Sequence, residues 1–450
     1  MSLFDYQESH VDALHKAINE PCLTAIDASD TGTGKTYTAA ALAARSKWRV
    51  AVVCPKAVLI SWHRVLTQFN VEIMGISNYE LFKGGQWYLP NDSKLGDISA
   101  TCPYMIRPLD KKSNIRWKEL EPDMLFIFDE AHRCKNKATG NAKVLLSLAD
   151  QPCRKLLLSA TIADKPEFFA VFARMLNLIN DVSEHRLFLK KLSVGPATTG
   201  LSYLKRTIAG AGAAPSMLQL HGIVFPQHGS RMRISDTKDH FQMNTVKAHS
   251  YKMDDDIRDE IKRQYAYISA VHTEAEAKEL TATCRLAEIV RARQKIEALK
   301  VKTMAELVSD HLDNGDSVAV FVNYLDTMAL LQDLLGVKCV IKGGQTTSER
   351  QGMIDAFNED RERVIICQIQ SGGVGISLHD TIGVHPRVSI ISPSWSAQDL
   401  VQAFGRIHRA GGKTPCVQKI VYCHDTIEDT ICSLINQKIL NYSMLNDGRQ

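Results

Sequence analysis

The 450-residue sequence contains no run of about 18 consecutive apolar residues, so we expect no transmembrane helix and no membrane partner. Residues 1–11 carry acidic side chains and lack an apolar core, which argues against a secretory signal peptide. The eleven cysteines are scattered, and no two of them form a Cys-x-x-Cys pair. An odd count without metal-ligand spacing favours reduced thiols over a zinc ribbon. These absences predict a soluble, intracellular protein.

Internal repeats and low-complexity tails are also absent, and the length predicts two or three globular domains. The net charge is only +4, but its distribution along the chain is uneven. Residues 185–252 hold ten lysines or arginines against two aspartates, which gives this segment a charge of +8 and leaves −4 for the rest. A basic segment in an otherwise acidic chain predicts contact with a phosphate backbone.

A glycine-rich segment, residues 30–36, has the composition of a phosphate-binding loop. Gly32 and Gly34 lack side chains, so the backbone there can turn tightly and direct its N–H groups at phosphate oxygens. Lys35 supplies a positive charge for the β and γ phosphates, and the Thr36 hydroxyl suits Mg²⁺. ATP and Mg²⁺ are therefore the predicted cofactors.

The residues on either side of this loop support the prediction. Residues 22–28 are apolar and predict a short strand, and the Ala-rich residues 37–45 predict a helix. A bound anion would then lie at a helix N-terminus. Ser29 stands where the usual pattern has its leading glycine, so the strict motif is missed by one residue. The alternative is a chance glycine-rich turn.

Two acidic residues, Asp129 and Glu130, follow the apolar run 124–128, which is typical of a strand buried on both faces. A carboxylate at such a strand end can hold Mg²⁺ through water, and a neighbouring one can orient or deprotonate the attacking water. We assign Asp129 to the metal and Glu130 to the water. Alone, the pair would also be consistent with a solvated strand end.

A second polar segment lies at residues 402–409, some 370 residues after the glycine-rich loop. It is doubly charged and suited to reaching a nucleotide from the side opposite the loop. A chain that closes one nucleotide between two lobes, and opens them on hydrolysis, is a motor rather than a simple hydrolase.

With these segments, the sequence resembles superfamily 2 helicases, and among them the Swi/Snf-type DNA translocases, including the annealing-helicase branch and related phage and viral proteins. The matching segments follow the family's order over residues 4–432: 52–62, 76–80, 129–136, 344–358, 372–378, 395–409 and 425–431. Three positions depart from the Swi/Snf pattern. Residues 159–161 have the Ser-Ala-Thr of general superfamily 2 members, Ser377 replaces the usual Asn, and Thr33 replaces a common Leu.

The resemblance implies roles for further residues. Arg406 and Arg409 would be arginine fingers that stabilise charge on the transferred phosphoryl group, and Gln402 would contact the γ-phosphate or the water. Ser159 and Thr161 would couple the nucleotide state to lobe movement, and His132 would link the acidic segment to the second lobe. Gln7 would contact adenine, and the full nucleotide-binding set is Gln7, Gly32, Thr33, Gly34, Lys35, Thr36 and Gly375.

The implied fold class is α/β, with two RecA-like parallel-sheet lobes and a basic, partly helical insertion between them. The clearest strands are expected at 50–54, 125–128, 155–158, 318–322, 364–367 and 388–391. The expected divisions are a first lobe at 1–180, the insertion at 181–252, a helical segment leading into the second lobe at 253–312, the second lobe at 313–433 and a helical tail at 434–450.

The insertion supplies the candidate nucleic-acid contacts: Arg231, Arg233, Lys238 and Lys247. Arg231 and Arg233 alternate on an extended segment, so they would point the same way and could clamp a DNA backbone. The alternative is a solvated edge. Aromatic residues are not interleaved with these charges, so the segment offers little support for a base-stacking platform.

We therefore expect a monomeric, DNA-dependent ATPase that translocates on duplex or branched DNA and remodels DNA structures or protein–DNA complexes. Two alternatives stay open. One is a strand-separating helicase acting on DNA or, less favoured, RNA, for which no wedge hairpin can be identified in the sequence. The other is an ATP-gated nucleic-acid clamp without processive movement. A protein partner is not identifiable.

Overall fold

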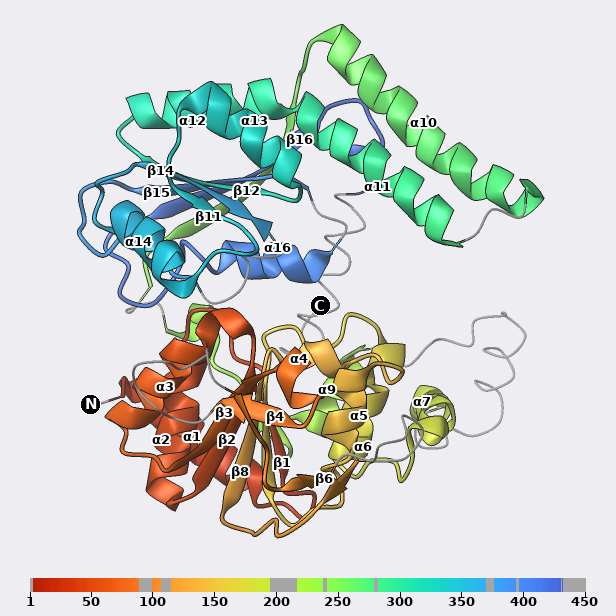
Figure 1. Ribbon diagram of the computed structural model, residues 1–450, viewed down its shortest axis with the longest axis vertical. Coiled ribbons are helices and arrows are strands. Elements are labelled where there is room, and N and C mark those ends of the chain that lie inside the picture. The colour runs from red at the N-terminus through yellow and green to blue at the C-terminus, as the bar shows by residue number, and fades with distance from the viewer. Residues whose placement is uncertain are drawn as a thin grey trace. The chain divides into compact units, whose positions relative to one another are not determined.

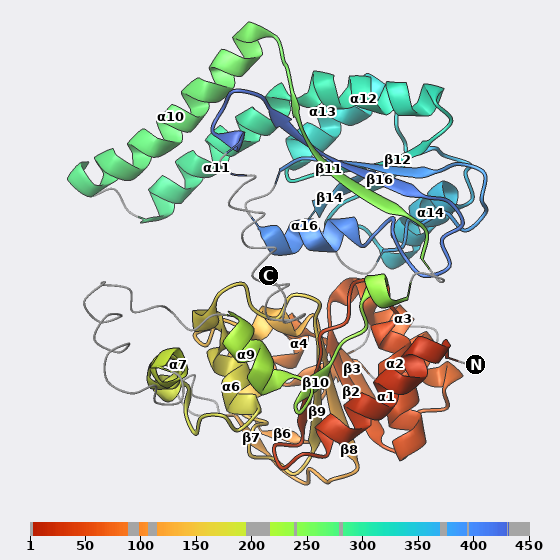
Figure 2. The same cartoon turned by 180° about the vertical axis from the view of Figure 1, so that it is seen from behind.

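The computed structural model describes residues 3–88, 99–106, 115–194, 217–237, 241–278, 282–369, 376–393, 396–429 and 431. The chain divides into two compact units, Met1–Thr237 and Lys238–Lys438, which we call lobe 1 and lobe 2. Each contains a central, mainly parallel sheet (Figures 1 and 2). Among the helices described, none has the length and apolar character needed to cross a membrane.

The sheet of lobe 1 has the strand order β10-β1-β9-β8-β2-β3-β4-β5. All neighbours from β10 to β3 pair in parallel, and β4 and β5 add an antiparallel edge. The strands are β1 (Thr24–Asp27), β2 (Arg49–Cys54), β3 (Ile73–Asn78), β4 (Gln86–Tyr88), β5 (Ser99–Thr101), β8 (Met124–Asp129), β9 (Arg154–Leu158) and β10 (Gly229–Ser230).

Helices cover both faces of this sheet, which explains the apolar runs of its strands. Leu125 and Ile127 of β8 pack with helices α1 (Asp5–Ile18), α2 (Lys35–Ser46) and α3 (Leu59–Gln68). Phe126 and Phe128 belong to the core on the other face, with α5 (Gly140–Leu146), α6 (Ala170–Met175) and α9 (Met217–Val224). Successive side chains thus enter opposite cores, as the period of a strand requires.

The sheet of lobe 2 has the order β11-β16-β15-β12-β14-β13, with every described pairing parallel. Its strands are β11 (Asn244–Tyr251), β12 (Ser317–Val322), β13 (Val340–Ile341), β14 (Val364–Gln368), β15 (Arg387–Ile391) and β16 (Cys416–Cys423). Figure 1 places α12 (Val301–Asp313) and α13 (Leu325–Leu335) on one face of the sheet. On the other face lie α14 (Thr347–Asn358) and α16 (Ala397–Phe404). The prediction of two parallel α/β lobes is confirmed.

The residues predicted as a basic insertion are divided between the lobes. Strand β10 pairs with β1 in lobe 1, and β11 pairs with β16 in lobe 2. Between β11 and α12, the helices α10 (Asp255–Lys278) and α11 (Ala282–Leu299) form a hairpin that packs on the core of lobe 2. The predicted tail at 434–450 falls outside the described residues.

Candidate nucleotide-binding site

The phosphate-binding loop connects β1 to α2, and its two predicted glycines have the backbone that only glycine adopts easily. Gly32 has φ +92° and Gly34 has φ +94°, and α2 begins at Lys35 directly afterwards. A Cβ atom on Gly34 would also lie 2.3 Å from Nε2 of Gln7. The loop therefore presents its N–H groups at the N-terminus of a 12-residue helix, which suits an anion.

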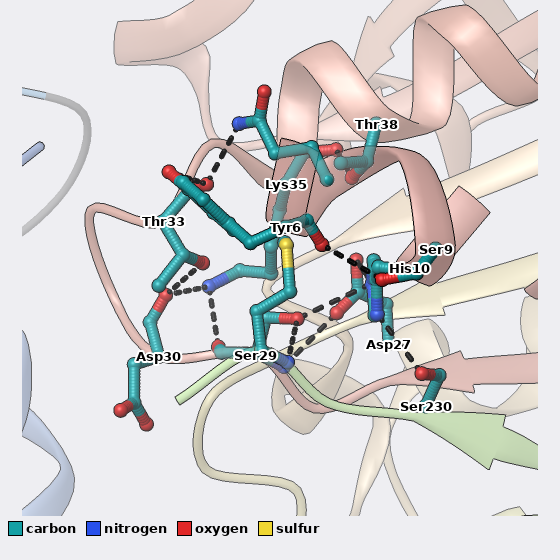
Figure 3. A network of polar contacts seen from close by, with 12 residues as sticks. Tyr6, Ser9, His10, Asp27, Ser29, Asp30, Thr33, Lys35, Thr38 and Ser230 are labelled. Atoms are coloured by element: carbon teal, nitrogen blue, oxygen red, sulfur yellow. Dashed lines mark hydrogen bonds and ion pairs between the residues drawn. The ribbon is translucent and has the colours of Figure 1, made fainter. Parts of the chain in front are cut away.

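Lys35 lies over the first half of the loop. Its Nζ donates to the carbonyl oxygens of Ser29, at 2.8 Å, and of Asp30, at 3.1 Å. The Thr33 hydroxyl donates to the same Asp30 carbonyl at 2.8 Å. The main chain of Ser29 and Asp30 thus fixes where the lysine ammonium lies, as Figure 3 shows.

Helix α1 contacts the loop from one side. The side-chain amide of Gln7 donates to the Thr33 carbonyl at 2.9 Å, and the Tyr6 hydroxyl reaches the same oxygen at 3.3 Å. Burial raises the pKa of Tyr6 to about 12, so its hydroxyl stays a donor at neutral pH. Gln7 was predicted to contact adenine, and the structure places it against the phosphate-binding loop.

A buried ion pair lies beneath the loop (Figure 3), and sequence reasoning missed it. Nε2 of His10 is 3.1 Å from Oδ2 of Asp27, and both residues are less than 5% exposed. Asp27 Oδ1 accepts from the Ser29 N–H at 2.9 Å, and His10 Nδ1 lies 2.9 Å from the Ser230 hydroxyl. Burial raises the pKa of the Asp27 carboxyl, but the charge and hydrogen bond of His10 outweigh it and hold that pKa below its usual value.

Strand β8 ends at Asp129, and this end lies at the same edge of the sheet as the phosphate-binding loop. In the register, Asp27 of β1 and Asp129 of β8 both pair with Leu158 of β9, which lies between them. The carboxyl ends of parallel strands are where ligands bind in open α/β sheets. The sheet therefore brings the start of the loop, Asp129 and the start of the Ser159–Thr161 segment to one edge.

Two aromatic side chains hold Asp129, and their roles were not predicted. The indole N–H of the fully buried Trp62, on α3, donates to Oδ2 of Asp129 at 2.9 Å. The Tyr79 hydroxyl donates to the Asp129 carbonyl at 2.8 Å. Carboxylate and hydroxyl oxygens are the donors that Mg²⁺ prefers, so Asp129 and Thr36 fit the predicted metal.

The remaining predicted residues of lobe 1 form a short chain of contacts. Nδ1 of His132 is 2.9 Å from the Ser159 hydroxyl and 3.2 Å from a Glu130 carboxylate oxygen. The Ser159 hydroxyl also accepts from the Thr161 N–H at 3.2 Å. Burial, together with the nearby charges of Arg133, Lys135 and Lys35, holds the pKa of His132 well below its usual value. A neutral imidazole therefore joins Glu130 to the Ser159–Thr161 segment.

Glu130 itself has an unusual backbone. Its φ is +55°, in the left-handed region that a non-glycine residue enters at some cost. This conformation ends strand β8 and starts the single turn Ala131–Cys134, which contains His132. Strain of this kind often accompanies functional positions, which fits the predicted role of Glu130.

In lobe 2 the predicted arginines lie at and after the end of α16. Arg406 is only 2% exposed and donates to the carbonyls of Gln402, at 2.9 Å, and Ile376, at 3.4 Å. Arg409 donates to Gly405 at 3.1 Å and to the same Ile376 carbonyl at 3.0 Å. The structure thus brings Gln402, Arg406 and Arg409 together within lobe 2. Gly375 lies outside the described residues.

The four predicted DNA contacts do not form one group within a lobe. Arg231 is 12% exposed and pairs with the Asp30 carboxylate at 2.5 Å. Arg233 lies 3.9 Å from Asp236 in the same lobe, and Lys247 is exposed on β11 in lobe 2. Lys238 falls outside the described residues.

Comparisons with family models and known proteins show the family of the chain. Residues 1–164 match the model described as "Type III restriction enzyme, res subunit", and residues 299–411 match "Helicase conserved C-terminal domain". The chain is 35% identical over 460 residues to a protein of Acanthamoeba polyphaga mimivirus named "Putative ATP-dependent RNA helicase L364", covering 99% of this chain and 84% of that one.

The chain is also similar to two more distant proteins. The chain is 23% identical over 438 residues to a Xenopus laevis SWI/SNF-related regulator of chromatin, subfamily A-like protein 1. That match covers 92% of this chain and 41% of the Xenopus protein. Among solved structures, the SWI2/SNF2 ATPase core of Sulfolobus solfataricus is similar at TM-score 0.39 and 16% identity, over 100% of this chain and 94% of that one.

The two matched models cover residues 1–164 of lobe 1 and residues 299–411 of lobe 2, and the mimivirus protein matches nearly the whole chain. The chain belongs to the ATP-dependent helicases of superfamily 2.

Proposed function

We propose that this ATPase translocates on duplex DNA and remodels DNA structures or protein–DNA complexes. The observation that carries the DNA assignment is the similarity to the SWI/SNF-related protein along 92% of the chain. It agrees with the order of the motifs over residues 4–432 and with the positive charge of residues 185–252.

In this proposal the two lobes supply complementary groups to one ATP. Lys35 binds the β and γ phosphates, and Glu130 orients the attacking water. Arg406 and Arg409 of lobe 2 stabilise the negative charge that develops on the transferred phosphoryl group. Mg²⁺, when held by Thr36 and, through water, by Asp129, would neutralise phosphate charge.

Coupling to nucleic acid follows from the contacts of Glu130. Its carboxylate lies beside the neutral His132, which contacts Ser159 and so reaches Thr161. A change at the water-orienting carboxylate can therefore move the Ser159–Thr161 segment. We propose that this chain of contacts transmits the nucleotide state from Glu130 to the Ser159–Thr161 segment.

A second candidate is an RNA helicase, which the name of the mimivirus relative favours. One experiment distinguishes the DNA translocase from the RNA helicase. ATPase turnover is measured without nucleic acid and with single-stranded DNA, duplex DNA, forked DNA and duplex RNA, and Lys35→Ala serves as the inactive control. We expect duplex or forked DNA to stimulate most. Preferential stimulation by RNA would overturn the DNA assignment.

Movement is tested separately from stimulation. A translocase on intact duplex displaces a triplex-forming third strand without unwinding the duplex beneath it. A strand-separating helicase instead releases one strand of a forked duplex, and a clamp does neither. We expect ATP-dependent triplex displacement, and its absence from an active ATPase would exclude translocation on duplex DNA.

A further inference from the structure

The segment Gly229–Ile234, which we call the connector, lies along the first half of the phosphate-binding loop. It begins with β10 and continues toward lobe 2, which begins at Lys238. In Figure 3, Ser230 at its start lies close to the His10–Asp27 pair beneath the loop. The connector therefore touches the nucleotide site although it is about 200 residues away in the sequence.

Main-chain hydrogen bonds join the connector to the loop in register. The Ala28 N–H donates to the Ser230 carbonyl at 3.0 Å, and the Asp30 N–H donates to the Met232 carbonyl at 3.0 Å. In return, the Met232 N–H donates to the Ser29 hydroxyl at 2.9 Å. These bonds extend the pairing of β10 with β1 past the end of the sheet and into the loop.

The Asp30 carboxylate is the centre of the side-chain contacts. Its Oδ1 accepts from Arg231 at 2.5 Å, and its Oδ2 accepts from the Ile234 N–H at 3.0 Å. The Arg231 side chain is 12% exposed and that of Asp30 is 25% exposed, so solvent screens this pair less than a surface pair. The connector thus donates a hydrogen bond to each oxygen of the Asp30 carboxylate.

We propose that Arg231 is a positioning residue of the phosphate-binding loop and acts through Asp30. The carbonyls of Ser29 and Asp30 are the groups that hold Lys35 Nζ, at 2.8 and 3.1 Å. Whatever fixes the Asp30 main chain therefore fixes the approach of the lysine to the phosphates. Arg231 does so from the connector, and this role deepens the proposed ATPase function.

This role makes predictions that differ from those of a DNA contact. Arg231→Ala frees one Asp30 oxygen and lets the loop sample positions in which Lys35 is misplaced. We expect the affinity for ADP and the KM for ATP to worsen by about tenfold, or ~1.4 kcal/mol, with a smaller change in kcat. If Arg231 contacted a DNA phosphate, Arg231→Ala would instead make the dependence of log DNA affinity on log salt less steep by ~0.9.

The experiment uses the full chain and a fluorescent ADP analogue, without nucleic acid, beside salt titrations of duplex binding. Arg231→Lys should restore much of the affinity, because it keeps a charge for Asp30. Asp30→Asn should weaken ADP binding as Arg231→Ala does, and the double variant should be little worse than either single one. The control is Arg174→Ala, which removes another arginine–aspartate pair of lobe 1, in which Arg174 is 15% exposed and its partner Asp150 is 77% exposed.

Additive effects of Asp30→Asn and Arg231→Ala would overturn the proposal, as would unchanged ADP affinity in Arg231→Ala with a thermal stability equal to that of the control. A lower salt slope with normal ADP affinity would assign Arg231 to the nucleic acid. If no variant or wild type hydrolyses ATP but the ADP effects hold, the proposed function fails and the positioning role stands.

Discussion

Replacing Trp62 by Phe removes one hydrogen bond to the predicted metal-binding carboxylate and leaves a smaller ring in the core of lobe 1. The indole N–H donates to Oδ2 of Asp129 at 2.9 Å, and Oδ1 of the same carboxylate accepts from the Glu130 N–H at 3.0 Å. Trp62 is fully buried, so water cannot replace the lost donor without entering the core of lobe 1. The Asp129 carboxylate then loses one of the contacts that fix the position from which it would face Mg²⁺.

A hydrogen bond to a charged group contributes ~1.5–3 kcal/mol, and the lower value corresponds to about tenfold in a binding constant. Mg²⁺ should increase the affinity for ADP, and we expect this increase to be about tenfold smaller in Trp62→Phe than in wild type. Binding of ADP in EDTA should change little, because the phosphate-binding loop is not altered. The measurement is fluorescent ADP binding with Mg²⁺ and with EDTA, in both proteins.

Trp117→Phe is the matched control. It removes an indole N–H bond of the same length, 2.9 Å, to the Ser147 hydroxyl of the same lobe, where no carboxylate is involved. Trp62 is fully buried and Trp117 is partly buried against the core of the same lobe, and only Trp62→Phe should diminish the effect of Mg²⁺. An equal Mg²⁺ effect in wild type and Trp62→Phe would show that the hydrogen bond does not position Asp129.

Three further predictions concern the site and the pH dependence of stability. Glu130→Gln should bind ATP and lower turnover by ~10²–10⁴-fold, and parental turnover would mean that another residue orients the water. Arg409→Ala should lower turnover by ~10³–10⁵-fold and partly keep nucleotide binding, whereas Arg361→Ala, which breaks an exposed ion pair of lobe 2, should not. Burial, with Arg409 and Arg387 nearby, lowers the pKa of His379 to about 4. Because the unfolded chain protonates this histidine near pH 6.5, stability is fully present above that pH and is lost toward pH 4, by at most ~1.4 kcal/mol per unit. Thermal unfolding at pH 7.5 and 5.5 should therefore show a larger loss in wild type than in His379→Asn.

Strands with a continuous apolar run were predictable, because such a run is typical of a strand buried on both faces: β1, β2, β8, β9, β12, β14 and β15. The run at 124–128 became β8, and the run at 318–322 became β12. Strands β10 and β11 were missed for the opposite reason. Residues 229–230 are too short to show a pattern, and residues 244–251 mix polar and apolar side chains. The basic segment was therefore predicted as a separate insertion.

The residues of the phosphate-binding loop were predictable because a glycine-rich loop between a strand and a helix is a local pattern. Contacts between distant residues were not. Asp129 and Trp62 are 67 residues apart, and Asp30 and Arg231 are 201 residues apart. Which of them meet depends on the order of strands in the sheet, above all on β10 pairing with β1. Neither composition nor spacing contains that order.

The partner of each arginine decides whether its charge is available to a nucleic acid or to a phosphoryl group. The segment 185–252 has a charge of +8 in the sequence, but Arg231 lies against a carboxylate, which cancels its charge locally. Arg409 differs, because the carbonyls of Gly405 and Ile376 accept its hydrogen bonds and fix the orientation of its side chain. In our proposal, Arg231 instead shapes the loop through Asp30. The charge of the segment therefore overstates what it can offer to a nucleic acid, and within the segment Lys247 differs from Arg231 in being exposed, on β11 of lobe 2.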